Sequence, residues 1–399
     1  MKTLKSLATS LAALAVATSG ALAQDAIKIG EINSYKAQPA FLEPYKKGWE
    51  LAVEEINKAG GVGGRKLEVI SRDDNATPGD AVRVAEELVS RENVVLLTGS
   101  FLSHIGLAIS DFAKQRKMLF VAAEPLTDKI VWENGHRYTY RLRASTYMQT
   151  SMLVADAAKL KKKKWAVVYP NYEYGQSAIA SFKTLMKAAQ PDVEFVAEQA
   201  SPLGKIDAGA VAQALADAKP DAIFNVTFGA DLAKFVREGQ TRGLFKDMPV
   251  FSLLSGEPEY LDPLKDETPV GWYVTGYPAA DIATPEHKVF FDAYKAKYNE
   301  APKLGSVVGY SAIQTIAAAL KKAGGTDTEK LVDAMSGLEV GTPFGKVMYR
   351  PQDNQSTMGA YVGRLGLKDG KGVMTDWRYE LGEKHLPSDA DVKARRPAN

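Results

Sequence analysis

Apolar residues in the first part of the chain follow two alternating patterns. Strand-length apolar runs occupy residues 26–32, 66–74, 94–100 and 118–124. Between them, apolar residues recur every three or four positions, which places them on one face of a helix. One such face carries Trp49, Ala52, Val53 and Ile56, and the next, after Pro78, carries Ala81, Val84, Ala85 and Leu88. Because strands and helices alternate, the pattern predicts a parallel sheet with helices on both faces.

The same alternation begins again after residues 138–145. Strand-like runs occupy residues 165–171, 193–199, 222–228, 250–256 and 272–277. Helix-like runs occupy residues 175–190, 208–220, 284–299 and 307–325, and residues 345–380 have the pattern of strands and turns. The repetition predicts an α/β fold built from two doubly wound, Rossmann-like lobes.

Four glycines within five positions, Gly60, Gly61, Gly63 and Gly64, raise the question of a phosphate-binding loop. Such a loop needs G-x-x-x-x-G-K-[ST] between a strand and a helix, so that the helix N-terminus faces the anion. Here the glycines follow a helix and precede a strand, and neither Ser nor Thr follows Lys66. The run therefore predicts a helix end and a turn, not a nucleotide site.

The N-terminus has the pattern of an export signal. Lys2 and Lys5 precede an apolar core at residues 7–16, and an A-x-A site ends at Ala23. We therefore expect residues 1–23 to be a cleavable signal peptide, with a core too short to span a bilayer. The chain has no cysteine, which excludes disulfides and lipid attachment to an N-terminal cysteine. These features predict a periplasmic protein without a membrane anchor.

Charge points to no polyanionic partner. The chain has 50 Lys and Arg against 48 Asp and Glu, and removal of Lys2 and Lys5 would leave 48 against 48. A balanced charge gives no reason to expect nucleic acid as a partner. The four histidines have no metal-ligand spacing, so we expect no metal and no cofactor.

Three segments together resemble a known family. Residues 48–100, 165–177 and 220–244 are similar, in this order, to type I periplasmic binding proteins of the leucine/isoleucine/valine-binding and amide/aromatic-acid-binding group. The resemblance implies two lobes joined by three crossovers, with the ligand in the cleft between them. It places lobe 1 at residues 24–143 plus 277–350, and lobe 2 at 144–276 plus 351–399. It also implies a monomer that delivers a small-molecule solute to an ABC permease with its ATPase.

Ser103 is the first candidate ligand residue. It lies at the start of a predicted helix, where its hydroxyl and the free N–H groups of the first turn can hold a carboxylate. The family uses the serine at this position in that way. The alternative is a plain helix cap.

Acidic and aromatic residues complete the candidate site. Glu124 can bind an ammonium group or pair with a protein cation. Thr127 follows it, in a segment where the family binds the ligand with small residues and Thr. Glu257 lies near the family's ammonium-binding acid. The resemblance places Tyr174, its neighbour Tyr172, Phe228 and Phe41 in the cleft wall. Phe101 adds a further ring, with the alternative that it belongs to the core. In open α/β sheets, ligands bind outside the carboxyl ends of the strands, where these loops lie.

The leading prediction is a small carboxylate-bearing solute, a branched-chain or related amino acid, captured by lobe closure, and an aromatic acid or amide is the alternative. If Glu124 or Glu257 faces the cleft unpaired, a branched-chain or related amino acid is favoured, because an unmatched buried acid is costly. If neither does, an aromatic acid or amide is favoured. Two other functions use the same scaffold, an exported hydrolase and a ligand sensor without transport. The sequence shows no G-x-S-x-G motif and no nucleophile–base–acid set, so we expect no catalytic residues.

Overall fold

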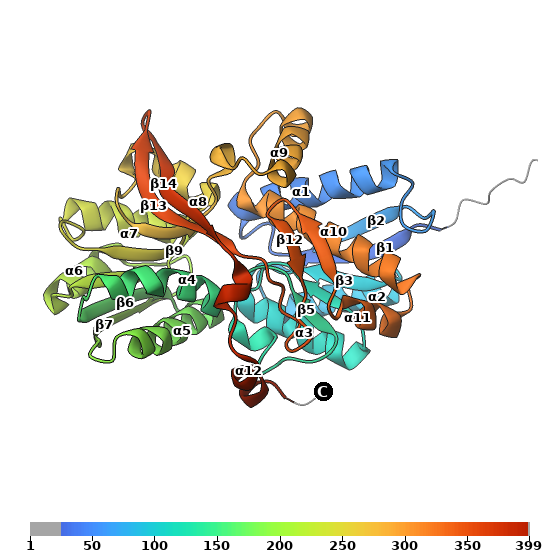
Figure 1. Cartoon of the computed structure of the whole chain (residues 1–399), viewed down its shortest axis with the longest axis horizontal. Coiled ribbons are helices and arrows are strands. Elements are labelled where there is room, and N and C mark those ends of the chain that lie inside the picture. The colour runs from blue at the N-terminus through green and yellow to red at the C-terminus, as the bar shows by residue number, and fades with distance from the viewer. Residues whose placement is uncertain (1–24, 398–399) are drawn as a thin grey trace, which may run out of the picture.

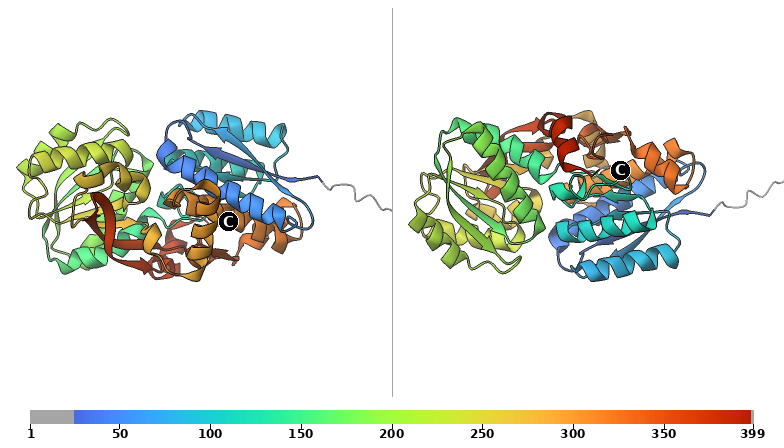
Figure 2. Two further views of the ribbon diagram at one scale, coloured as in Figure 1. Left: turned by 90° about the horizontal axis from the view of Figure 1, so that it is seen from above. Right: turned by 90° about the horizontal axis from the view of Figure 1, so that it is seen from below.

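The computed structural model describes residues 25–397, so the predicted signal peptide at residues 1–23 lies outside the described residues. Two sheets form the centres of two lobes, which lie side by side (Figures 1 and 2). The chain passes between the two lobes three times, after β5, after β10 and after β12. The predicted fold class, two doubly wound lobes joined by three crossovers, is confirmed.

The first sheet is parallel throughout and has the strand order β2-β1-β3-β4-β5. Its strands are β1 (Ile27–Asn33), β2 (Leu67–Asp73), β3 (Leu96–Gly99), β4 (Phe120–Ala122) and β5 (Thr139–Arg141). The helices α1 (Pro39–Lys58), α2 (Pro78–Ser90) and α3 (Ser103–Arg116) connect them, followed by the short helix η1 (Asp128–Ile130). All strands point the same way, so their carboxyl ends share one edge of the sheet.

The second sheet has the order β14-β13-β10-β9-β8-β6-β7 and is parallel except for β13 and β14. Its strands are β6 (Lys164–Pro170), β7 (Glu194–Ser201), β8 (Ala222–Asn225), β9 (Val250–Gly256), β10 (Tyr273–Gly276), β13 (Ala360–Lys368) and β14 (Lys371–Glu380). Its helices are α4 (Thr146–Lys159), α5 (Glu173–Ala189), α6 (Ala208–Ala218), α7 (Gly229–Thr241) and α8 (Pro258–Leu261), with η2 (Asp262–Glu267) after α8. The late strands β13 and β14 therefore extend a sheet that was begun some 200 residues earlier.

The remaining elements all follow β10 along the chain. They are η3 (Ala279–Asp281), α9 (Pro285–Tyr298), α10 (Leu304–Ala323), α11 (Thr328–Met335), the hairpin β11 (Glu339–Thr342) and β12 (Gly345–Met348), then η4 (Gly382–His385) and α12 (Asp389–Arg395). Helix α10 packs along α1 of the first lobe (Figure 1). Glycines allow the two helices to approach closely: a Cβ at Gly48 would lie 2.0 Å from the carbonyl oxygen of Ser306.

The glycine run lies between α1 and β2, and all four glycines have positive φ, from 58° to 101°. The predicted helix end and turn are confirmed. Helix α4, by contrast, has no counterpart among the helix-like runs in the sequence. Its buried residues include Met148, Thr150, Met152 and Leu153, so polar and apolar residues share the buried side and no clear apolar period marks the helix.

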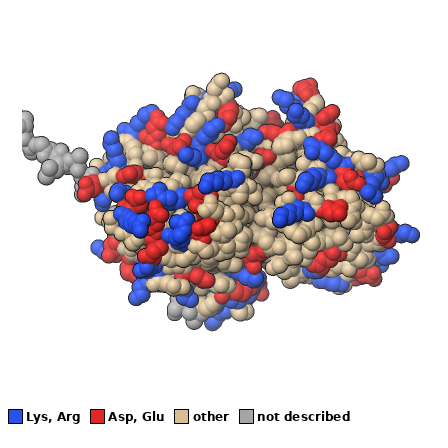
Figure 3. All heavy atoms as spheres, turned by 180° about the vertical axis from the view of Figure 1, so that it is seen from behind, with Lys and Arg blue, Asp and Glu red and all other residues tan. Residues whose placement is uncertain are grey.

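Lys and Arg side chains are mixed with Asp and Glu over the face shown in Figure 3. No helix among residues 25–397 is long and apolar enough to cross a membrane. The same residues contain no cluster of three or more His, Asp or Glu side chains with the geometry of a metal site.

Candidate functional site

Loops from the carboxyl ends of both sheets meet in a cleft between the lobes. They border a narrow space with room for about one water molecule. The lining residues are Phe101, Ser103, Glu124, Leu126, Arg143, Tyr172, Tyr174, Phe228 and Leu254. Six of the nine residues predicted for the site are in this lining; Phe41, Thr127 and Glu257 are not, and Glu257 lines a neighbouring pocket together with Arg143.

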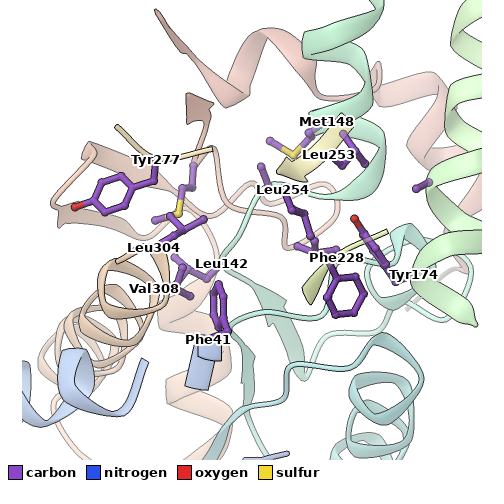
Figure 4. Close-up of a cluster of buried hydrophobic side chains, with 14 of the residues drawn as sticks. Phe41, Leu142, Met148, Tyr174, Phe228, Leu253, Leu254, Tyr277, Leu304 and Val308 are labelled. Atoms are coloured by element: carbon purple, nitrogen blue, oxygen red, sulfur yellow. The ribbon is translucent and has the colours of Figure 1, made fainter. Parts of the chain in front are cut away.

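Aromatic rings form a continuous wall across the cleft. Phe41 on α1 contacts Phe101 with ring centroids 5.1 Å apart, and Phe101 contacts Phe228 of the second lobe at 6.1 Å. Phe228 then contacts Tyr174 at 5.8 Å, and Tyr174 contacts Tyr172 at 6.0 Å. Figure 4 shows Phe41, Phe228 and Tyr174 in one buried cluster, each from a different element. Such a wall suits an apolar ligand body.

Ser103 is the first residue of α3, and Leu102 occupies the N-cap position. Its hydroxyl does not cap the helix but accepts a hydrogen bond of 3.2 Å from the backbone N–H of Thr127. Within residues 25–397, the backbone N–H groups of Ser103 and His104 have no protein acceptor. The start of α3 therefore presents free donors at the cleft, which is the arrangement that binds carboxylates.

Arg143 is the functional residue that sequence reasoning missed. It follows β5 in the first crossover, is 6% exposed, and lies over the ring of Phe41 at 5.5 Å. Its guanidinium donates to Glu124 of the first lobe at 2.8 Å and also to Glu257 of the second lobe. The two candidate acids are thus paired with one buried cation. No motif in the residues 138–145 marks this arginine, because its role depends on three loops that only the fold brings together.

Burial governs the ionisation of this group. Burial raises the pKa of Glu124 to about 7 although Arg143 opposes the shift, and burial raises the pKa of Glu257 well above its ordinary value. Burial alone would lower the pKa of Arg143, but Glu257 and Glu124 outweigh it and raise that pKa. Glu259, also buried, adds a third carboxyl whose pKa burial raises. With one cation facing three carboxyls, burial favours a proton on one or more of the carboxyls.

Several polar atoms around the cleft have no partner among the described residues. They are Glu124 Oε1, Glu257 Oε2, Glu259 Oε2 and the hydroxyls of Tyr174 and Tyr260. Buried polar atoms are nearly always hydrogen-bonded, so a concentration of unpartnered ones indicates a place that a ligand or water completes. Leu254 adds backbone strain at the same place, since its φ of 66° is unfavourable for a side chain of this kind.

Thr127 lies behind the lining, and its hydroxyl donates to Glu173 of the second lobe at 2.6 Å. Its backbone N–H is the group that Ser103 accepts. Its contact with the cleft is therefore through Ser103.

A serine–histidine–glutamate arrangement lies outside the cleft. Ser151 Oγ is 3.0 Å from Nδ1 of His385, and Nε2 of His385 is 3.2 Å from Glu380. Ser151 lies in the interior of α4, where the backbone N–H groups already donate within the helix and so form no oxyanion hole. The arrangement connects α4 to the C-terminal segment.

The periplasmic binding protein family matches residues 26–371, and the chain belongs to this family. The Leu/Ile/Val-binding protein homolog 7 of Brucella abortus (strain 2308) is 29% identical over 386 residues, which cover 92% of this chain and 94% of the relative. The leucine-, isoleucine-, valine-, threonine-, and alanine-binding protein of Pseudomonas aeruginosa is 26% identical over 344 residues, covering 84% and 89%.

A solved structure is similar over a comparable length. The solute-binding protein of an ABC transporter from Rhodopseudomonas palustris BisB5, in complex with 3,4-dihydroxybenzoic acid, is 27% identical with a TM-score of 0.80. The match covers 90% of this chain and 98% of that chain. The protein is thus a solute-binding protein of an ABC transporter, a non-enzymatic receptor. The hydrolase alternative is excluded on this ground.

Proposed function

We propose that this receptor captures a small solute with a carboxylate and an aromatic body in the periplasm and delivers it to an ABC permease with its ATPase. The observation that carries the proposal is the cleft lining, in which a wall of aromatic rings surrounds Arg143 and the free N–H groups at the start of α3. A guanidinium and a helix N-terminus are both partners that a buried carboxylate needs. The similarity to a receptor solved with 3,4-dihydroxybenzoic acid supports the same class.

The pairing of Glu124 and Glu257 with Arg143 also favours an acid without an amine. Both carboxylates already have a cation, so neither is the unpaired acid that an ammonium group would require. In this proposal Ser103, Glu124, Tyr172, Tyr174, Phe101 and Phe228 contact the solute. Phe41, Thr127 and Glu257 support them from behind. We also propose that residues 1–23 are a cleavable signal peptide, that the lobes have the limits predicted from the sequence, and that the protein is a monomer.

A hydrophobic amino acid is the second candidate, on one specific observation. Glu124 Oε1 and Glu257 Oε2 are buried without a hydrogen-bond partner, and one cation faces more than one carboxyl. An ammonium group would supply both the missing donors and the missing charge. The relatives named as Leu/Ile/Val-binding proteins support this candidate.

A thermal-shift screen of aromatic carboxylates, amino acids and amides tests the proposal, because a ligand that binds only the folded state raises the melting temperature. We expect a hydroxylated or unsubstituted aromatic carboxylate to give the largest shift. Ser103→Ala should weaken that ligand by roughly 1–3 kcal/mol, the cost of an unsatisfied buried partner. Ser90→Ala, at the exposed end of α2, is the control. A neutral solute as the best stabiliser, with Ser103→Ala indifferent, would refute the carboxylate assignment.

A further inference from the structure

Residues 127–129 belong to the first lobe by position but bind the second lobe with their side chains. They follow β4 and include the start of η1, and they lie against the N-terminal half of α5. Thr127 Oγ1 donates to Oε1 of Glu173 at 2.6 Å, and Lys129 Nζ is 2.9 Å from Oε2 of the same carboxylate. Both oxygens of Glu173 are therefore held from the opposite lobe.

Asp128, between these two residues, makes a different kind of contact. Its buried carboxylate accepts from Thr146 Oγ1 at 2.8 Å, Ser181 Oγ at 2.8 Å and the N–H of Tyr147 at 3.0 Å. Thr146 and Tyr147 start α4 just after the first crossover, and Ser181 lies in the middle of α5. Asp128 therefore ties η1 to the start of α4 and to the middle of α5, whereas Glu173 lies at the end of α5 that faces the cleft.

Glu173 is connected directly to both walls of the cleft. Its chain neighbours Tyr172 and Tyr174 line the cavity from the second lobe. Its partner Thr127 donates a backbone hydrogen bond to Ser103, which lines the cavity from the first lobe. The path Ser103–Thr127–Glu173 thus crosses from one wall to the other in two hydrogen bonds of 3.2 and 2.6 Å.

We propose that Glu173 is a positioning residue that latches the two lobes together at the cleft, through Thr127 and Lys129. The Glu173 side chain is 12% exposed, so its bond to Thr127 is shielded from water, whereas Lys129 is 49% exposed and contributes less. The latch lowers the free energy of the closed arrangement and slows ligand release. It does not contact the solute itself. The inference rests on the receptor function proposed above, with the two lobes closing around the solute by hinge bending, and not on the identity of the ligand.

A distance measurement between spin labels tests the latch without any ligand. The chain has no cysteine, so Lys46→Cys on α1 and Lys205→Cys before α6 can be labelled without competition. Both positions are exposed, one in each lobe. Pulsed electron paramagnetic resonance then gives the interlobe distance distribution of the free protein. A failure of the ligand proposal leaves this measurement unaffected.

Glu173→Ala in the labelled protein should lower the closed-to-open ratio by roughly three- to tenfold, the factor expected for one hydrogen bond. Lys183→Ala is the matched control, because Lys183 on the same helix pairs with Glu198 within the second lobe. The charge exchange Lys129→Glu with Glu173→Lys should restore the part of the closed population that the ion pair contributes, which a merely structural role would not do. Lys129→Ala alone, at an exposed position, gives a smaller shift in a variant that keeps its fold.

An unchanged distance distribution in folded Glu173→Ala overturns the latch. An equal shift in Lys183→Ala also overturns it, since the effect would then be general destabilisation of α5. If Glu173→Ala does not fold, Lys129→Ala and the charge exchange decide. Opening in Lys129→Ala that the charge exchange reverses supports the latch, whereas an unchanged distribution in Lys129→Ala, or opening that the exchange does not reverse, refutes it.

Discussion

Two buried glutamates of the first lobe, Glu31 in β1 and Glu124 just after β4, differ in how their carboxyl groups are completed. Burial raises the pKa of each to about 7. Glu31 accepts from Asn33 Nδ2 at 2.8 Å on one oxygen and from Ser71 Oγ at 2.5 Å on the other. Glu124 accepts from Arg143 on one oxygen, and its second oxygen has no partner among the described residues.

The comparison separates a structural acid from a site acid. Neutral donors around Glu31 satisfy both oxygens within the core, so nothing further is required there. Glu124 lines the cavity and shares a single cation with Glu257 across the cleft. A buried carboxyl that lacks a hydrogen-bond partner and lies next to a cavity is typical of a ligand-binding site. Similar pKa values therefore do not imply similar roles.

Removal of the shared cation should have the largest effect. Arg143→Met leaves Glu124 and Glu257 buried without a positive partner, and breaking such a pair costs about 3–5 kcal/mol. The loss should be smaller at pH 5 than at pH 8, because the carboxyls then hold protons. Urea denaturation at both pH values measures it.

Arg137→Met is the control for this variant. Arg137 pairs with Glu329 and Asp333 at the surface, and exposed pairs contribute about 0–1 kcal/mol. Equal losses in the two variants would contradict the site role of Arg143.

The second prediction concerns pH. The folded-state pKa of Glu31 and of Glu124 is raised from 4.5 to about 7, so the folded protein holds these protons more tightly than the unfolded chain. Their stabilisation is complete below pH 4.5 and is lost as the pH rises through about 7, by up to about 3 kcal/mol for each group. Glu31→Gln and Glu124→Gln should each flatten the fall in unfolding free energy between pH 5 and pH 8.

The ligand distinguishes these two variants. A bound solute should change the pH dependence that Glu124 contributes and leave that of Glu31 as it was. If the ligand alters both contributions equally, the distinction between a core acid and a site acid is wrong.

The smallest expected effect concerns two buried tyrosine hydroxyl groups, one with a hydrogen-bond partner and one without. The hydroxyl of Tyr174 is buried at the cavity without a partner, whereas that of Tyr277 is 2.6 Å from Nε2 of His287. Tyr277→Phe should lose about 1 kcal/mol of stability, because it removes a made hydrogen bond. Tyr174→Phe should be neutral or slightly stabilising in the free protein. Thermal denaturation of both variants measures the difference, and equal losses would contradict it.

Most of the fold could be predicted because its elements are marked locally. The strands of both sheets coincide with short apolar runs, and α1 and α2 follow apolar positions at helical spacing. Helix α4 could not be predicted in this way, since its buried side mixes Thr and Gln with apolar residues. The three residues of β5 were also too short to give a pattern.

The site was predicted only in part. Ser103 and the rings of Tyr174 and Phe228 were found from a helix start and from family resemblance, and all three line the cavity. Whether Glu124 binds a ligand or a protein cation stayed open in the sequence, and the structure gives it Arg143. Arg143 was missed because a single arginine, in a segment at a lobe boundary, matches no sequence motif.

The sequence by itself determined the order of strands and helices, the repetition of the lobe and the absence of cysteine, since these follow from local pattern and composition. The tertiary structure decided which side chains meet: Arg143 lies between residues 19 positions before it and 114 positions after it. Such contacts depend on where parallel strands end, and the carboxyl edges of two sheets meet only after the chain has crossed between them. The charge balance of the cleft is therefore a property of the fold, although every residue in it is written in the sequence.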